Sequence, residues 1–194
     1  MFFILFLLVL LVPSVALSLR WKSEETLWTA ALDVDPNSPR AHYHVGLAAQ
    51  DARALDDAEF HYVRALELSP KMESARLNLG ITLGQKGDLP GARSQFQILL
   101  QSPHAQYQSL AQYHLGLDAY YFKKYKEAVD WFEKSLKSDP TSADGYKGKA
   151  ILYASVNKRD LALTNWKAYL AKTPEPNKKV PKELVPLVGG SNVR

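Results

Sequence analysis

The chain of 194 residues contains no cysteine. This absence excludes disulfide bonds, thiolate metal sites and cysteine nucleophiles, because each of them needs a cysteine sulfur. It leaves the redox compartment of the protein open, since chains without cysteine occur in oxidising and reducing compartments alike.

Neither sign of charge dominates the chain. The 24 Lys and Arg residues and the 20 Asp and Glu residues give a formal net charge of +4 at pH 7. Acidic and basic residues alternate along most of the sequence, whereas a nucleic-acid-binding protein usually gathers its basic side chains on one face. We therefore expect no nucleic-acid partner. The apolar fraction of 46% is typical of a globular protein.

The sequence also lacks a recognisable catalytic or metal-binding pattern. His42 and His44 are two residues apart, and this spacing turns them in different directions on a helix, where a ligand pair needs three or four. The other histidines, His61, His104 and His114, have no carboxylate at ligand spacing, and we expect all five to be solvated or hydrogen-bonded. The sequence thus predicts no enzyme activity, no cofactor and no metal in this chain.

The first 19 residues, MFFILFLLVLLVPSVALSL, carry no charged side chain. A helix needs about 20 apolar residues to cross a bilayer core, and membrane helices tolerate a residue such as Pro13 better than soluble ones do. We expect a transmembrane helix over 1–19. A cleaved signal sequence is the main alternative, because the small pairs Ser14/Ala16 and Ala16/Ser18 suit a peptidase, although the usual positively charged start is missing. A buried core helix is the third.

The remainder of the chain repeats one pattern. Three classes of position recur at intervals of 34, 36 and 34 residues, and proline closes most of the units. The classes are the small residues Gly46, Gly80, Gly116 and Ala150, the alanines Ala58, Ala92, Ala128 and Ala162, and the aromatic residues Tyr62, Phe96, Phe132 and Trp166. Each unit has apolar residues at helical spacing, then a turn, then a second helical stretch. The small residues let two helices approach closely, and the aromatic residue fills the space between neighbouring helices.

This pattern resembles the tetratricopeptide repeat (TPR), W-x2-L-G-x2-Y…A-x3-F…P, which has a period of about 34 residues. It is written here as HYHVGLAA…A…Y…P, RLNLGITL…A…F, QYHLGLDA…A…F…P and YKGKAILY…A…W…P. The resemblance implies an all-α fold, a TPR α-solenoid of about four helix-turn-helix repeats. The expected domains are an N-terminal hydrophobic helix (1–19), a leading half-repeat helix (20–36), an array over 37–173 (repeats 39–70, 73–104, 109–140 and 143–173) and a Pro-rich basic tail (174–194).

Two connections in this scheme are irregular. The stretch QSPHAQYQ, between the second and third repeats, holds two extra residues and predicts looser stacking of the repeats there. The tail has no polar helix of the kind that normally closes such an array. We expect the tail to be disordered unless its segment KELVPLV packs back on the last helix.

The resemblance implies a concave groove lined by the first helix of each repeat, which binds a protein or peptide ligand. Aromatic anchors with a few polar neighbours are typical of such grooves. The alternative is that several of these side chains pack between repeats. The candidate groove residues are Arg40, Tyr43, Leu47, Leu77, Asn78, Ile81, Tyr113, Leu117, Tyr120, Tyr121, Lys147 and Ile151. Tyr43 and Tyr113 recur at the same place in two repeats and are the strongest candidates.

A second resemblance lies at SLRWKSEETLWTAALDVDPNSPRAHYHVGLAA and extends over roughly residues 20–100. This stretch is similar to the junction between the last membrane helix and the repeats of membrane-bound glycosyltransferases of the O-mannosyltransferase type. It implies that the chain corresponds to the non-catalytic C-terminal part of such an enzyme, whose catalytic residues would lie elsewhere.

Our leading interpretation is a membrane-tethered scaffold that binds a protein or peptide in its groove. The alternatives are the substrate-recruiting module of a membrane glycosyltransferase and a periplasmic or secreted adaptor with a cleaved signal peptide. Arg20 and Lys22 would place the repeats in the cytoplasm under the positive-inside rule. The glycosyltransferase resemblance implies the opposite side, and we expect a single-pass membrane protein with extracytoplasmic repeats.

Overall fold

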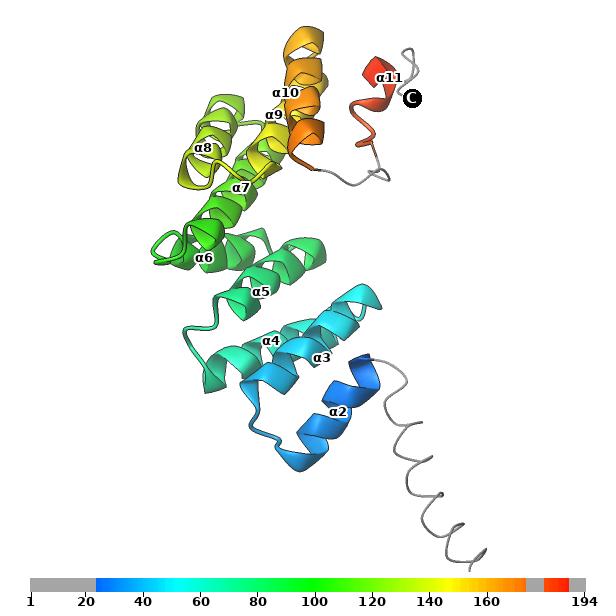
Figure 1. Ribbon diagram of the computed structural model, residues 1–194, viewed down its shortest axis with the longest axis vertical. Coiled ribbons are helices and arrows are strands. Elements are labelled where there is room, and N and C mark those ends of the chain that lie inside the picture. The colour runs from blue at the N-terminus through cyan, green and yellow to red at the C-terminus, as the bar shows by residue number, and fades with distance from the viewer. Residues whose placement is uncertain (1–23, 174–179, 189–194) are drawn as a thin grey trace, which may run out of the picture. The chain divides into compact units, whose positions relative to one another are not determined.

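The computed structural model describes residues 24–173 and 180–188, and every regular element in these two ranges is an α-helix (Figure 1). The predicted transmembrane helix over 1–19 lies outside the described residues. Among the helices that the structure does describe, none is both long and apolar enough to cross a bilayer.

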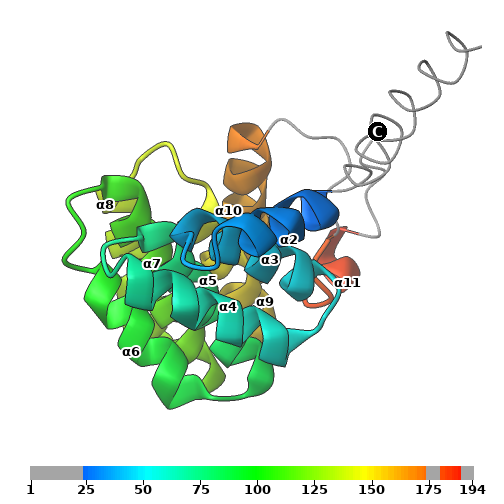
Figure 2. The same ribbon diagram turned by 90° about the horizontal axis from the view of Figure 1, so that it is seen from below.

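The chain divides into two compact units between Asp88 and Leu89. In the first unit α2 packs against α3, α3 against α4 and α4 against α5, and the α2–α3 pair is seen clearly in Figure 2. The two first helices of the repeats, α3 and α5, also touch each other. The helices of this unit are α2 (Glu24–Val34), α3 (Pro39–Asp51), α4 (Leu55–Leu68) and α5 (Glu73–Lys86).

The second unit continues the same succession of helix pairs. Helix α7 packs against α6, α8 and α9, and α9 packs against α8 and α10. Arg93 ties α6 to α7, because its Nε and Nη2 donate hydrogen bonds of 2.9 and 2.8 Å to Oδ2 of Asp118. The helices are α6 (Leu89–Leu99), α7 (Ala105–Tyr121), α8 (Tyr125–Ser138), α9 (Asp144–Ser155), α10 (Arg159–Lys172) and α11 (Val185–Val188).

The turn within each repeat contains a residue in the left-handed conformation. These residues are Arg53, Gly87, Lys123 and Asn157, with φ of 61°, 90°, 58° and 58°. In all four turns the next amide donates a hydrogen bond of 2.8–2.9 Å to a carbonyl five residues earlier, as from Ala54 to Ala49. This bond closes the first helix in the way a Schellman motif does. The repeat period therefore appears in the backbone conformation of the turns as well as in the packing of the core.

The small residues of the first helices do admit a ring from the second helix, as the sequence predicted. A Cβ atom added to Gly46 would lie 2.7 Å from the ring of Tyr62, and one added to Gly116 would lie 2.5 Å from the ring of Phe132. Phe132 also lies against α9, where a Cβ on Gly148 would come within 2.4 Å of its ring. Two helices therefore approach Phe132 through positions that have no side chain.

The connection at 101–108 carries hydrogen bonds of its own, while the looser stacking of the repeats expected there stays a prediction. The backbone amide of His104 donates to Oγ of Ser102 at 2.9 Å, and Nε2 of Gln108 donates to the carbonyl of Ser102 at 2.6 Å. The extra residues lengthen α7, which has 17 residues, against 13 in α3 and 14 in α5. The division between the two compact units falls instead at Asp88, inside the second repeat.

The described part of the tail packs back on the array. Helix α11 follows α10 in the chain and packs against it (Figure 1). The side chain of Leu184 is fully buried. Residues 180–188 are therefore packed against the last helix of the array, which is one of the two alternatives that the sequence left open for the tail. The predicted disorder of 174–179 and 189–194 concerns residues outside the described ranges.

Candidate functional site

The candidate groove residues lie on the first helices α3, α5, α7 and α9, and we call the surface they form on each unit its first-helix face. In the first unit this face joins two repeats. Nδ2 of Asn78 on α5 donates a hydrogen bond of 3.3 Å to the hydroxyl of Tyr43 on α3. Both side chains are half-buried, as are the apolar candidates Leu47, Leu77 and Ile81 on the same helices.

Arg40 lies at the edge of the first-helix face that is nearest α2. Its guanidinium carbon is 5.4 Å from the ring centroid of Trp28 on α2. The ring of His44 stacks on the same indole with a centroid distance of 4.0 Å and an interplanar angle of 3°. The structure thus places Arg40 against the leading half-repeat helix, where it remains exposed to solvent.

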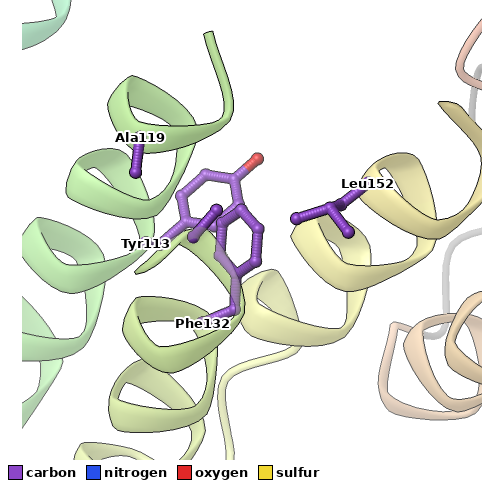
Figure 3. Packing of buried hydrophobic residues seen from close by; sticks show 5 residues of the cluster. Tyr113, Ala119, Phe132 and Leu152 are labelled. Atoms are coloured by element: carbon purple, nitrogen blue, oxygen red, sulfur yellow. The ribbon is translucent and has the colours of Figure 1, made fainter. Parts of the chain in front are cut away.

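Tyr113 occupies a different environment from its counterpart Tyr43. It is only 8% exposed and belongs to a core cluster with Phe132 and Leu152 (Figure 3). Its ring centroid lies 6.0 Å from that of Phe132, and burial raises the pKa of its hydroxyl above the usual 10.0. Tyr113 therefore packs mainly between helices, and its contact with a ligand stays a prediction.

On the second unit, other candidate groove residues form the exposed part of the first-helix face. Leu117 and Tyr120 on α7 are partly buried against the core cluster, while Tyr121 is 69% exposed. On α9, Lys147 and Ile151 are half-buried. The face therefore combines apolar and aromatic surface on α7 with a cationic side chain on α9.

Lys147 provides a positive charge beside a histidine that stays neutral. The ring of His114 stacks on Phe96 with centroids 4.7 Å apart and an interplanar angle of 9°. Burial first, and the charge of Lys147 second, lower the pKa of His114 to about 4. At neutral pH the positive charge at this place is therefore that of Lys147 alone.

Two neighbours of this face were missed from the sequence. Nζ of Lys147 lies 6.0 Å from the ring centroid of Tyr169 on α10, and Asp144 at the start of α9 acts on the hydroxyls of both Tyr113 and Tyr169. Tyr169 belongs to a second helix, so a groove lined by first helices does not predict it. Asp144 lies in the first turn of α9, where a carboxylate complements the helix dipole whether or not a ligand is near.

His42 and His61 form a hydrogen-bonded pair. Their Nδ1 atoms are 2.9 Å apart, and Nε2 of His42 lies 3.1 Å from the carbonyl of Pro36. Because a carbonyl only accepts, Nε2 of His42 carries a proton, and between the two Nδ1 atoms one ring donates and the other accepts. Within the described ranges no group of three or more His, Asp, Glu or Cys side chains is arranged to hold a metal ion.

Successive helix pairs of this kind define the class of helical repeat proteins. The tetratricopeptide repeat family model matches residues 25–73 and 77–143. The chain belongs to the tetratricopeptide repeat family.

Comparison with known proteins shows one curated relative and several structures with the same fold. The chain is 27% identical over 137 residues to the human Protein O-mannosyl-transferase TMTC3, a match that covers 69% of this chain and 15% of that protein. The chain thus spans about 15% of the length of this relative.

Among solved structures, pilF of Pseudomonas aeruginosa has a TM-score of 0.67 at 21% identity and covers 81% of this chain and 69% of its own. YrrB, a TPR protein with an unusual peptide-binding site, has a TM-score of 0.54 at 17% identity and covers 76% of this chain and 75% of its own. These likenesses show the fold.

Proposed function

We propose that this chain is a membrane-tethered scaffold that binds an extended protein segment along its first-helix faces. TPR proteins bind proteins or peptides, and this chain carries no recognised catalytic constellation in its sequence. The scaffold would act by mass action, holding a partner near the membrane without turnover.

The observation that carries the proposal is the state of Asn78. One N–H of the Asn78 amide donates to the hydroxyl of Tyr43. Within the part of the chain that the structure describes, the side-chain carbonyl and the second N–H of Asn78 have no partner. An amide with one free donor and one free acceptor matches the backbone N–H and C=O of an extended peptide. Tyr43 beside it offers the flat, half-buried ring that a peptide side chain packs on.

The second unit supplies complementary features on its own face. Leu117, Tyr120 and Tyr121 present apolar and aromatic surface to a side chain of the ligand. Lys147 supplies a fixed positive charge for an acidic side chain or a C-terminal carboxylate. A peptide with an acidic group next to apolar residues is therefore the ligand class that this face favours.

Substitution of Asn78 by alanine should weaken peptide binding about tenfold, because a hydrogen-bonded contact contributes roughly 1 kcal/mol or more. The probe is a peptide selected on the full chain from a random displayed library, with affinity measured by fluorescence anisotropy. Phe60→Ala is the matched control, since Phe60 is 59% exposed on the second helix α4 and should leave affinity unchanged. Equal weakening by both substitutions, at unchanged thermal stability, would contradict the proposal.

The apolar segment 1–19 supports the membrane tether, and the similarity to human TMTC3 supports a second candidate function. In that case the chain is the non-catalytic, substrate-recruiting TPR module of a membrane glycosyltransferase. Both candidates place the repeats on the extracytoplasmic side of a membrane, and they differ in what precedes the repeats.

The size of the native polypeptide distinguishes these candidates. With an antibody against the repeats, a band in the membrane fraction of the size of the 194-residue chain would favour the tethered scaffold. A much larger membrane band would instead favour the glycosyltransferase module. A soluble band smaller by the length of 1–19 would show a cleaved signal and a periplasmic or secreted adaptor.

A further inference from the structure

The end of the array presents an apolar surface on the last two helices. Ala150 on α9 and Ala162 and Trp166 on α10 are at most 4% exposed. Around them lie the partly buried side chains of Tyr169 and Leu170. These five residues form what we call the end slot. In a longer array the next repeat would cover such a surface.

Here the chain covers the end slot with its own residues 180–188. Leu184 is fully buried among Ala150, Ala162 and Trp166, and Val180 and Leu187 pack at the edge of the same cluster. The three residues Val180, Leu184 and Leu187 have the spacing i, i+4, i+7, and they are carried by a turn over 182–184 that leads into the four-residue helix α11.

The turn and short helix in residues 180–188 depend on contacts with the end slot. The carbonyl of Pro181 accepts from the amides of Leu184 and Val185 at 2.9 and 3.2 Å, and the amide of Leu187 bonds to the carbonyl of Leu184 at 2.9 Å. A helix of one or two turns is unstable alone, because nucleation costs more than so few bonds return. The end slot therefore selects a segment by its apolar spacing and induces the helix.

We propose that the end slot is a second binding site, specific for short segments that present apolar residues at i, i+4 and i+7 through a turn followed by a short helix. Residues 180–188 are its resident ligand and keep it closed to segments of the same pattern on other chains. A tethered segment acts at an effective concentration on the order of millimolar, so a competing segment must bind tightly or be locally concentrated. The site takes a turn followed by a short helix rather than an extended peptide, and it is independent of the function proposed above.

The end slot also adjoins the first-helix face of its unit. Tyr169 stacks on Trp166 with ring centroids 4.9 Å apart, and the same ring lies 6.0 Å from Nζ of Lys147.

Opening the slot in the full chain tests the proposal. Leu184→Asp places a charge where Leu184 is buried and should release the segment. The probe is a labelled synthetic peptide of residues 179–190, KVPKELVPLVGG. We expect the variant to bind this peptide at least about tenfold more tightly than the unmodified chain, in which the tethered copy competes. Circular dichroism verifies that the variant keeps its helices, and Leu184→Ala serves as the milder second variant.

Two controls make the result specific. Val185→Asp adds the same charge at the next residue, whose side chain is 50% exposed, and it should bind the peptide no better than the unmodified chain. A peptide with aspartate in place of Leu184 should bind none of the chains. Equal binding by the unmodified chain and both Leu184 variants, or binding by none of them, would overturn the proposal.

Discussion

Replacing Phe132 by alanine should lower the free energy of unfolding by about 3 to 5 kcal/mol. The ring is fully buried, and it lies against Gly116 on α7 and Gly148 on α9. Glycine has no side chain that could move into the space left by the ring, so the cavity would stay largely open. The cost of such a truncation is greatest where the surroundings cannot collapse.

Chemical denaturation followed by circular dichroism measures this loss. Tyr125→Ala is the matched control, because Tyr125 lies on the same helix and is 37% exposed. Truncating this more exposed ring should cost less than about 1 kcal/mol. A loss of that small size for Phe132→Ala as well would show that the ring is not the centre of the packing in this unit.

Stability should fall as the pH decreases from about 6.5 to about 4, and His114 should account for much of the fall. The folded chain holds the pKa of His114 at about 4, whereas the ordinary value is 6.5. In this range the unfolded chain binds the extra proton and the folded chain does not, so acid favours unfolding. Above pH 6.5 the His114 ring is neutral in both the folded and the unfolded chain, and its contribution to stability is present in full. Allowing for the partial exposure of the ring, we expect a loss of about 2 kcal/mol at the acid end.

Denaturation curves at several pH values test this expectation. His114→Gln should flatten the dependence on pH, and the remaining slope would come largely from His61, whose pKa is also lowered, chiefly by burial. His104→Gln replaces an exposed histidine and should preserve the slope. An unchanged slope in the His114 variant would contradict the assignment.

The fold could be predicted because its packing rule is local and repeated. A small residue on the first helix faces a ring on the second, as Gly46 faces Tyr62 and Gly116 faces Phe132, and this pairing is visible as a period in the sequence. The left-handed residues Arg53, Lys123 and Asn157 could not be predicted in the same way. The hydrogen-bond pattern of the turn imposes the left-handed conformation on Arg53 and Lys123, whose side chains do not favour it, while asparagine adopts it more readily.

The candidate site was harder to predict, because recurrence does not distinguish exposed side chains from buried ones. Tyr43 and Tyr113 occupy equivalent positions, and each lies beside the ring of its own repeat, Tyr62 or Phe132. Leu152 of the next repeat also covers Tyr113, while Tyr43 remains half-buried. The difference depends on a neighbouring repeat that no local pattern describes. The covering segment of the end slot was visible only as the weak motif KELVPLV, since its helix depends on the surface that receives it.

The central claim is that a peptide binds on the first helices, and site-specific photo-crosslinking tests it most directly. A benzophenone amino acid replaces Tyr43 or Tyr120 in the full chain, and replaces Phe60 or Lys134 on the second helices α4 and α8 as controls. With the selected peptide present, illumination should crosslink the peptide from positions 43 and 120 and not from 60 and 134. Crosslinks from the second-helix positions, with none from the first, would contradict the account.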